Sequence, residues 1–334
     1  MNSFPPLRIL FLMGVTAGNV STAWAEFAAT TQGTMFYTDD VGIFSATRRL
    51  TRDGDPTQPA LDSKLTGQGS DFVFDPRAEI TKAFDNRYGS TIMSLEGSGF
   101  IYVANSRYDH GTLRAQVRHA FTSETSLLFR YYYSPDLFLG ENEERQTGTF
   151  QLVNESLTSH IWSARISQKL LPGLEANLLG RYGMRRYNAA FSERNTDFWT
   201  VGPHLEWKIL PRVTLGLSYH YERGLSDGRY QPEYEDDVSY INHYGSVDLD
   251  VELSERFSFS TALHYERNNW TSNLEGDERN GAQENVIQGE VILAYRLSET
   301  VKTYTGVQYS SRKESFEADA AKNLNIGLGL MAKF

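Results

Sequence analysis

The stretch NLNIGLGLMAKF, residues 323–334, decides the fold class. Its even-numbered positions carry Leu324, Ile326, Leu328 and Leu330, whereas its odd-numbered positions carry mainly Asn, Gly and Lys. A period of two is that of a β-strand, because successive side chains of a strand point to opposite faces of the sheet. The stretch therefore predicts a strand with one apolar face and one polar face.

The same alternation recurs along most of the chain, where short turns and longer polar connections separate the alternating stretches. This rhythm predicts fourteen strands, an even number that places both ends of the barrel chain on the side of the short turns. The predicted strands are 33–46, 70–83, 88–104, 108–121, 125–135, 155–169, 174–188, 196–209, 213–226, 237–253, 257–271, 283–297, 300–314 and 321–334.

Strand length separates a membrane barrel from a soluble sandwich or propeller. Strands of soluble proteins are mostly about five or six residues long, and a tilted strand that crosses a bilayer needs about 9–11. The predicted strands are longer than typical strands of soluble proteins and long enough to cross a bilayer. Short turns at one end and long loops at the other are typical of transmembrane barrels. The sequence therefore predicts an all-β fold, namely a transmembrane antiparallel up-and-down β-barrel of about 14 strands spanning residues 26–334.

The composition excludes several other classes. A mean hydropathy of -0.45 would suit a soluble protein, but in a barrel it averages an apolar lipid face with a polar lumen face. The net charge of -10 argues against a nucleic-acid partner. The absence of cysteine excludes disulfide frameworks, thiolate nucleophiles and Cys-ligated metals. After residue 25 no apolar run approaches the roughly 20 residues that a spanning helix needs.

The first 25 residues have the pattern of a secretory signal peptide. Arg8 precedes the apolar run 9–15, and Ala23-Trp24-Ala25 forms an A-x-A cleavage site. We expect residues 1–25 to be removed and the remaining chain to be exported to the bacterial outer membrane.

If the apolar face of each strand meets lipid, the alternate residues line the lumen. Basic side chains then gather in one half of the chain and acidic ones in the other, and we expect two walls of opposite sign across a wet pore. The predicted basic wall consists of Arg114, Arg118, Arg130, Arg165, Arg181 and Arg185, and the predicted acidic wall of Glu222, Asp248, Asp250, Glu252, Glu266 and Glu290. The alternative is that these charges pair with one another and fill the lumen.

The connection 136–154 is the predicted constricting loop. Its apolar cluster Leu137-Phe138-Leu139 suggests packing against the lumen wall or a partner, although it also fits a surface loop with an apolar tip. Inward-facing His204, His220 and His264, each with a carboxylate two residues further on, raise the question of a metal site, but the strands of His220 and His264 are not neighbours and His264 is too far away. We therefore expect no metal, cofactor or catalytic residue, and no enzyme activity.

Aromatic residues near the strand ends predict two girdles at the lipid–water interfaces, because amphipathic rings prefer those layers. On the side of the turns the candidates are Phe121, Trp207, Phe257, Phe259, Tyr295 and Phe334, and on the side of the loops they are Trp162, Tyr182, Trp199, Tyr221, Tyr265 and Tyr309.

The stretch 35–44, MFYTDDVGIF, resembles the opening strand of a family of outer-membrane β-barrel porins. An alternating last strand that ends in Phe334 resembles the terminal signature of Gram-negative outer-membrane barrels. The resemblance implies insertion by the barrel assembly machinery with Phe334 as its signal. Since members often accompany exopolysaccharide loci, it also implies a possible glycan exit pore with a periplasmic export partner.

The sequence thus predicts a porin-like channel for passive diffusion of small polar or charged solutes, surrounded by outer-membrane lipid and lipopolysaccharide. Two alternatives stay open. One is an exopolysaccharide exit pore that works with a periplasmic partner. The other is a closed structural or surface-binding barrel whose outer loops carry the function.

Overall fold

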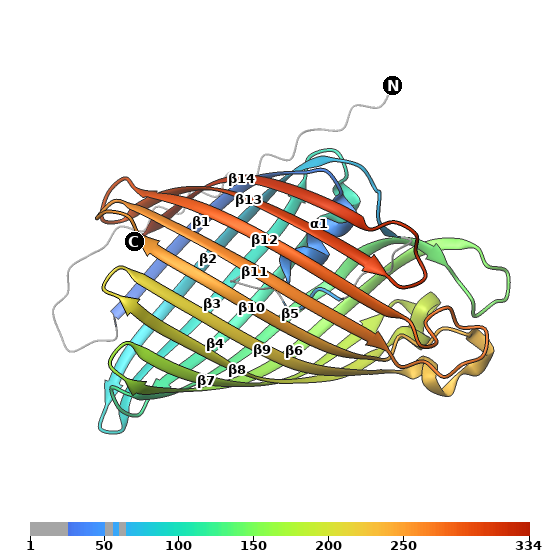
Figure 1. The fold of residues 1–334 in the computed structure, drawn as a ribbon, viewed down its shortest axis with the longest axis horizontal. Helices are drawn as coiled ribbons and strands as arrows, with labels where there is room; N and C mark the ends of the chain where they lie inside the picture. Colours follow the sequence, from blue (N-terminus) through green and yellow to red (C-terminus); the bar gives the residue numbers. More distant parts are fainter. Residues whose placement is uncertain (1–25, 51–55, 60–64) are drawn as a thin grey trace.

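The computed structural model describes residues 26–50, 56–59 and 65–334. Within these residues fourteen antiparallel strands form one closed barrel in chain order, and β1 pairs with β14 to complete the ring (Figure 1). The predicted fold class is therefore confirmed. The predicted signal peptide, residues 1–25, lies outside the described residues and stays a prediction.

Most strand positions agree with the predicted ones to within a few residues. The strands are β1 (Glu26–Thr38), β2 (Asp71–Asn86), β3 (Gly89–Tyr102), β4 (His110–Ala120), β5 (Thr125–Glu143), β6 (Leu152–Leu171), β7 (Leu174–Tyr187), β8 (Thr196–Leu210), β9 (Val213–Ser226), β10 (Tyr240–Glu252), β11 (Phe257–Trp270), β12 (Gln283–Arg296), β13 (Val301–Glu314) and β14 (Ala321–Lys333). The helices are α1 (Val41–Arg48) and the short 3-10 turns η2 (Ser106–Tyr108), η3 (Ala189–Arg194), η4 (Asp227–Tyr230) and η5 (Pro232–Tyr234). Among the helices described, none is long and apolar enough to cross a membrane.

The period-two pattern divides each strand between two environments. On β14 the side chain of Leu328 is 62% exposed on the outer face, whereas Asn323 and Asn325 are buried on the inner face. Aromatic rings such as Trp162, Tyr182 and Trp207 are exposed on the outside of the barrel. A closed barrel with an apolar outside and a polar inside is stable only in lipid. The protein is therefore an outer-membrane β-barrel, with short turns at one end and longer loops at the other (Figure 1).

The prediction for the first strand, 33–46, is wrong in its second half. β1 ends at Thr38, and the chain turns into the eight-residue helix α1. Asp40 causes the change, because its side chain accepts a hydrogen bond from the Gly42 amide at 3.0 Å and caps the helix. The aliphatic and aromatic residues that follow therefore lie on a helix and not on a strand.

The prediction that 136–154 is the constricting loop is also wrong. β5 continues to Glu143 and β6 begins at Leu152, so most of this stretch is a hairpin that projects beyond the barrel (Figure 1). The strands continue past an irregularity where Asp136 takes a φ of 42°. The apolar side chain of Leu137 packs in a buried cluster inside the barrel, and the stretch 136–154 does not itself close the lumen.

Candidate functional site

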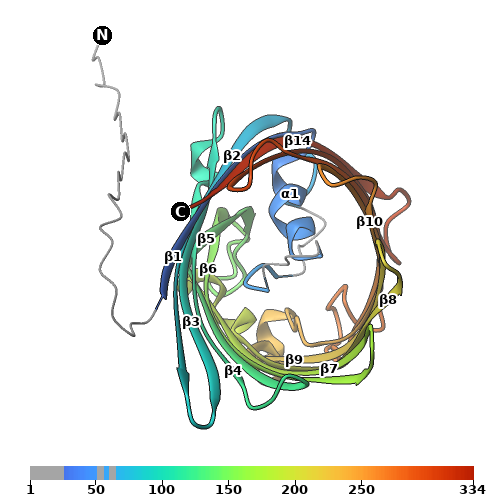
Figure 2. The same cartoon turned by 90° about the vertical axis from the view of Figure 1, so that its left-hand side faces the viewer.

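The lumen is occupied by the connection between β1 and β2. We call the described part of it, residues 39–50, 56–59 and 65–70, the inner segment. Viewed along the barrel, α1 lies within the ring of strands (Figure 2), and the side view places it at a level that the strands still surround (Figure 1). The described part of this connection therefore takes the constricting role that was predicted for 136–154, although the sequence pattern suggested a polar loop outside the barrel here as between the other strands.

Apolar contacts seat α1 on the barrel wall. The fully buried Phe44 lies with its ring centroid 5.5 Å from that of Phe36, 5.7 Å from that of Phe100 and 6.2 Å from that of Tyr102. Because an isolated helix of eight residues is not stable in water, these contacts must hold it in shape.

A second face of α1 meets the base of the projecting hairpin. Ile43 packs in one buried cluster with Leu65, Leu137 and Leu157. Of the two alternatives for the apolar run 137–139, the structure supports packing inside the barrel, where Leu137 and Leu139 contact the inner segment.

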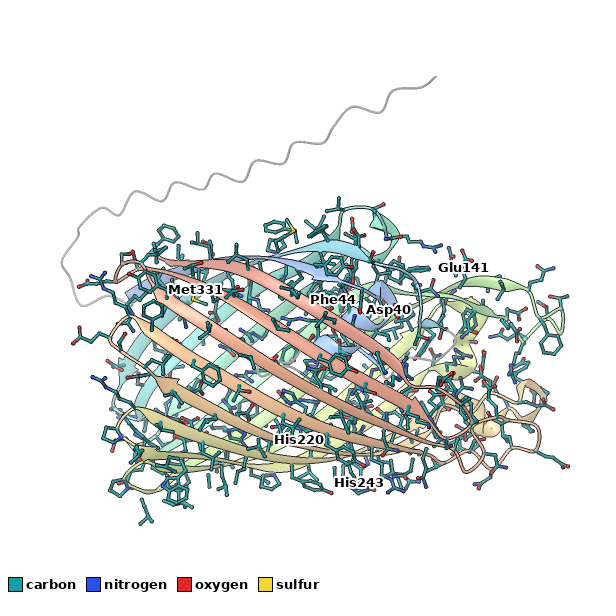
Figure 3. The ribbon with its side chains drawn as sticks, turned by 45° about the horizontal axis from the view of Figure 1, so that its top comes forward. Asp40, Phe44, Glu141, His220, His243 and Met331 are labelled. Atoms are coloured by element: carbon teal, nitrogen blue, oxygen red, sulfur yellow. The ribbon has the colours of Figure 1, made fainter. Side chains whose placement is uncertain are left out.

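Asp40 ties the two ends of the inner segment together. Its carboxylate accepts hydrogen bonds from the backbone amides of Gly67 at 2.6 Å and Gln68 at 3.2 Å, in addition to the helix cap. Burial raises the pKa of the Asp40 carboxyl above its ordinary value, and the amide donors offset part of that rise. Figure 3 shows Asp40 and Phe44 close together inside the half of the barrel nearer the loops.

Polar contacts join the inner segment to the far walls. Arg49 forms an ion pair and hydrogen bond with Glu266 on β11, whose side chain is 1% exposed. Arg185 on β7 donates to the Gln58 carbonyl at 3.1 Å. Ser159 on β6 donates to the Thr57 carbonyl at 2.8 Å. The segment is therefore attached to strands on several sides of the barrel.

A polar cavity of about 540 Å³ remains beside the inner segment. Nine residues of the two predicted walls line it, together with Arg49, Gln58 and tyrosine and histidine side chains of the strands. The nine are Arg114, Arg130, Arg165, Arg181, Arg185, Glu222, Asp248, Asp250 and Glu266.

The three remaining wall residues lie elsewhere. Arg118 points to the inner face, because it donates to inward-facing Ser126 at 3.3 Å. Glu290 is buried, with Ala262 and Gln308 opposite it on the neighbouring strands. Glu252 is exposed at the end of β10 on the side of the turns. The cavity is thus lined by most, but not all, of the predicted residues.

The two walls lie on different sides of the barrel and are paired where their edges approach each other. The basic residues lie on β4–β7 and the acidic ones on β9–β12, so their midpoints are five strands apart in a ring of fourteen. Arg181 and Glu222 approach to 3.8 Å. Arg114 donates to Glu96 at 2.6 Å, a carboxylate on the basic side. Part of the charge is therefore neutralised locally.

Sequence reasoning missed the inner-segment residues that line the cavity. Arg49 and Gln58 both face it. The signal that could have found them was Asp40 followed by Val41 and Phe44, an N-cap residue with apolar residues three apart. Glu206, which also lines the cavity, follows from the same inward parity as the predicted acidic residues.

The inward histidines make hydrogen bonds and ring contacts. Tyr244 links two of them, since its ring stacks on His220 at 5.3 Å and its hydroxyl lies 2.8 Å from Nδ1 of His264. His204 is hydrogen-bonded to Ser218. Over the described part of the chain, no group of three His, Asp or Glu side chains is arranged to hold a metal ion.

Buried ion pairs join the outer loops above the lumen. Asp236 accepts from Nε of Arg194 at 2.6 Å and from Nη1 of Arg279 at 2.9 Å. Arg194 also donates to Glu155 at 2.9 Å. Burial alone would raise the pKa of the Asp236 carboxyl, but the two guanidinium groups hold it below its ordinary value. We call these four residues the outer-loop cluster.

A larger hollow, of about 890 Å³, lies on the outer face of β2–β7. It is lined by the aromatic residues Tyr131, Trp162 and Tyr182 and by small residues such as Ala115 and Gly180. Since this surface faces lipid, the hollow is not on a solute route through the barrel.

One solved structure supports the fold. The chain is similar to the crystal structure of the outer membrane channel DcaP of Acinetobacter baumannii, with 12% identity, a TM-score of 0.57, and 96% of this chain and all of that one covered. It also aligns with the anion-selective porin from Comamonas acidovorans at 9% identity, covering 93% of this chain and 99% of that one, but that TM-score of 0.49 adds no argument. No protein-family model and no curated protein matches the chain.

The contact between Arg49 and Glu266 gives a first prediction. We expect the Arg49→Met variant to show larger current fluctuations in planar bilayers, because removing one partner of a buried ion pair costs about 3–5 kcal/mol. The matched control is Arg107→Met, since Arg107 pairs with Glu141 at 3.0 Å but both side chains are about half exposed. Exposed pairs contribute at most about 1 kcal/mol. Equal current noise in the two variants would show that the ion pair of Arg49 with Glu266 does not hold the inner segment in place.

Proposed function

We propose that this protein is a passive channel for small polar or charged solutes, narrowed by its own inner segment. The observation that carries the proposal is the polar, charged cavity of about 540 Å³ beside α1 in a closed outer-membrane barrel. Ionised side chains that line a wet lumen favour polar solutes and disfavour apolar ones. Transport of this kind needs no covalent chemistry.

The size of the barrel supports small solutes. Fourteen tilted strands enclose a backbone diameter of about 25 Å, and a helix with its side chains occupies about 10–12 Å of that width. Ions, sugars and small organic acids fit the space that remains, whereas a folded protein does not. The direct test is single-channel recording of the purified protein in planar bilayers. A barrel that gives no current steps under any voltage is not a channel.

The acidic side of the cavity gives a prediction on ion selectivity. We expect the Glu206→Gln, Asp248→Asn and Asp250→Asn triple variant to shift the reversal potential toward anions. A unit charge 8 Å away changes the energy of an ion in water by about 0.5 kcal/mol, so each neutralisation changes the local ion concentration about twofold. Reversal potentials are measured in a salt gradient. An unchanged reversal potential would place these carboxylates off the ion path.

A closed barrel is the second candidate, and the contacts of the inner segment favour it. Val41 and Phe44 are fully buried, and Arg49 and Arg185 bind across the lumen. In that case the function lies in the outer loops, which hold exposed aromatic residues such as Tyr230. The conductance experiment separates the two candidates.

The remaining proposals concern partners. We propose lipid and lipopolysaccharide around the barrel, and the barrel assembly machinery with Phe334 as the residue that it reads. The exopolysaccharide exit pore and its periplasmic partner stay a prediction from resemblance, since the polar cavity suits many solutes equally well.

A further inference from the structure

Six inward-facing arginines lie on the four consecutive strands β4–β7, and the strand register places four of them, one from each strand, in a zigzag. Arg118 on β4 is opposite Leu128 on β5, which is opposite Arg165 on β6. Two residues further along β5, Arg130 is opposite Ser163, which is opposite Arg181 on β7. Neighbouring strands are about 4.8 Å apart, so each arginine lies one strand from the next. We call these residues the arginine zigzag.

Three members of the zigzag lack an acidic partner. Among the described residues, no carboxylate oxygen lies within 4 Å of the guanidinium nitrogens of Arg118, Arg130 or Arg165. Arg130 and Arg165 line the cavity. Arg118 donates to a serine hydroxyl, and Arg130 donates to the amide oxygen of Gln116 at 2.9 Å. Nε of Arg165 is buried and makes no hydrogen bond.

Most other arginines of the lumen pair with carboxylates, and the buried Arg185 instead donates to the Tyr240 hydroxyl and to the backbone carbonyls of Pro56 and Gln58. Arg114 pairs with Glu96, Arg312 pairs with both Glu284 and Glu314, and Arg49 pairs with Glu266. The fold thus provides carboxylates for most of its inward cations. Neighbouring like charges destabilise a folded protein. The attraction of Arg165 to Glu175 offsets only part of its repulsion by Arg130 and Arg118, so the zigzag is a cost that an anionic ligand would remove.

We propose that the arginine zigzag is an anion-binding site for a small solute with two or more oxyanion groups, such as phosphates or carboxylates. A guanidinium group presents several donors in a planar fork that fits carboxylate and phosphate oxygens. Arg118 and Arg165 are separated by two strand spacings, about 10 Å at their Cα atoms. A solute with several oxyanion groups therefore matches the row better than a single ion does. The inference deepens the proposed channel function, because it names the solute class.

Binding is measured by titration calorimetry on the purified, detergent-solubilised protein, with sodium tripolyphosphate and inorganic phosphate as probes at low salt. We expect tripolyphosphate to bind at least tenfold more tightly than phosphate. We expect the Arg118→Gln, Arg130→Gln and Arg165→Gln triple variant to weaken tripolyphosphate binding at least tenfold. Should the triple variant not fold, as judged by heat-dependent migration on gels, Arg165→Gln alone should weaken it measurably.

The control is a triple variant with the same loss of charge outside the lumen. Arg87, Arg212 and Arg256 are exposed in the short turns, and their replacement by Gln should leave tripolyphosphate binding within twofold. Equal weakening in the two triple variants would overturn the site, because the effect would then depend on net charge alone. Absence of tripolyphosphate binding to the unaltered protein would overturn it as well.

Conductance distinguishes this inference from the channel proposal. If the barrel conducts and tripolyphosphate reduces the current only while the zigzag is intact, both stand. A conducting barrel that does not bind tripolyphosphate contradicts the site and leaves the channel. A barrel that binds it in calorimetry but never conducts contradicts the channel and leaves the site.

Discussion

A Phe44→Asp substitution is expected to raise the single-channel conductance at least about twofold. The reason is that α1, which is about 10 Å across, should move out of a barrel lumen that is about 25 Å wide. Phe44 is fully buried against three aromatic rings. Deleting a buried Phe side chain costs about 3–5 kcal/mol, and placing an unpaired carboxylate in the same pocket adds a desolvation cost. Since α1 has only eight residues, it should lose its structure when it leaves this seat.

The displacement of α1 has a second readout that does not depend on current. The chain contains no cysteine, so a single Thr47→Cys substitution provides a unique thiol on α1. Thr47 is 3% exposed, and we expect a water-soluble maleimide to label Cys at this position slowly. In combination with Phe44→Asp, labelling should become fast while the barrel still migrates as a folded species.

The matched control for this substitution is Phe316→Asp. Phe316 lies in the outer loop between β13 and β14 and is 44% exposed, so the same change of side chain should alter neither conductance nor thiol labelling. A Phe44→Leu variant, which keeps the pocket apolar, should behave almost like the unaltered protein. If Phe44→Asp labels as slowly as the control and conducts no more, α1 is not held by this aromatic seat.

The barrel could be predicted from the sequence because lipid imposes one simple rule. Each strand must turn an apolar side outward, so a period of two over long stretches is sufficient evidence, and the ends of β7, β9 and β13 were located almost to the residue. The rule fails where the chain leaves the lipid. In the hairpin of β5 and β6 the strands extend beyond the membrane, and the polar composition there was wrongly interpreted as a loop.

The inner segment could not be predicted for a related reason. Val41, Ile43 and Phe44 are apolar, which suits the outward face of a strand as well as a buried helix. Only the N-cap residue Asp40 indicates the helix rather than the strand. Whether a connection folds into the lumen or away from it depends on contacts with residues such as Leu137 and Phe100, which are far away in sequence.

The direction of the charged residues followed from parity, but their pairing did not. Alternation indicates that Arg114 and Arg165 both face inward. It does not indicate that Arg114 finds Glu96 across the β3–β4 pair, while Arg165 has Leu128 and Leu179 opposite it. Register and side-chain length decide which charges are neutralised, and both are properties of the folded barrel. The two walls of the sequence analysis therefore contain the zigzag without revealing it.

The outer-loop cluster predicts a large loss of order on Asp236→Asn. The carboxylate of Asp236 is fully buried between Arg194 and Arg279. Removing one partner of a buried charge network leaves the other charges uncompensated and costs about 3–5 kcal/mol. Because the loops that carry these residues are held to one another by this network, we expect trypsin at pH 7 to cleave them much faster in the variant. Asp227→Asn, at an exposed position of η4, should cleave like the unaltered protein.

Acid should reproduce the effect of the substitution in the unaltered protein. The pKa of Asp236 is lower in the folded state than its ordinary value of 3.8, so its ionised form stabilises the loops above about pH 3.8. That contribution decreases as the pH falls below 3.8 and is lost once the pH passes the folded pKa. Pepsin cleavage between pH 4.5 and 2, normalised to an unfolded substrate, should therefore increase at the outer loops. In Asp236→Asn the loops are already loosened, so their cleavage should depend less on pH across this range. An equal pH dependence in both proteins would show that another group controls the acid response.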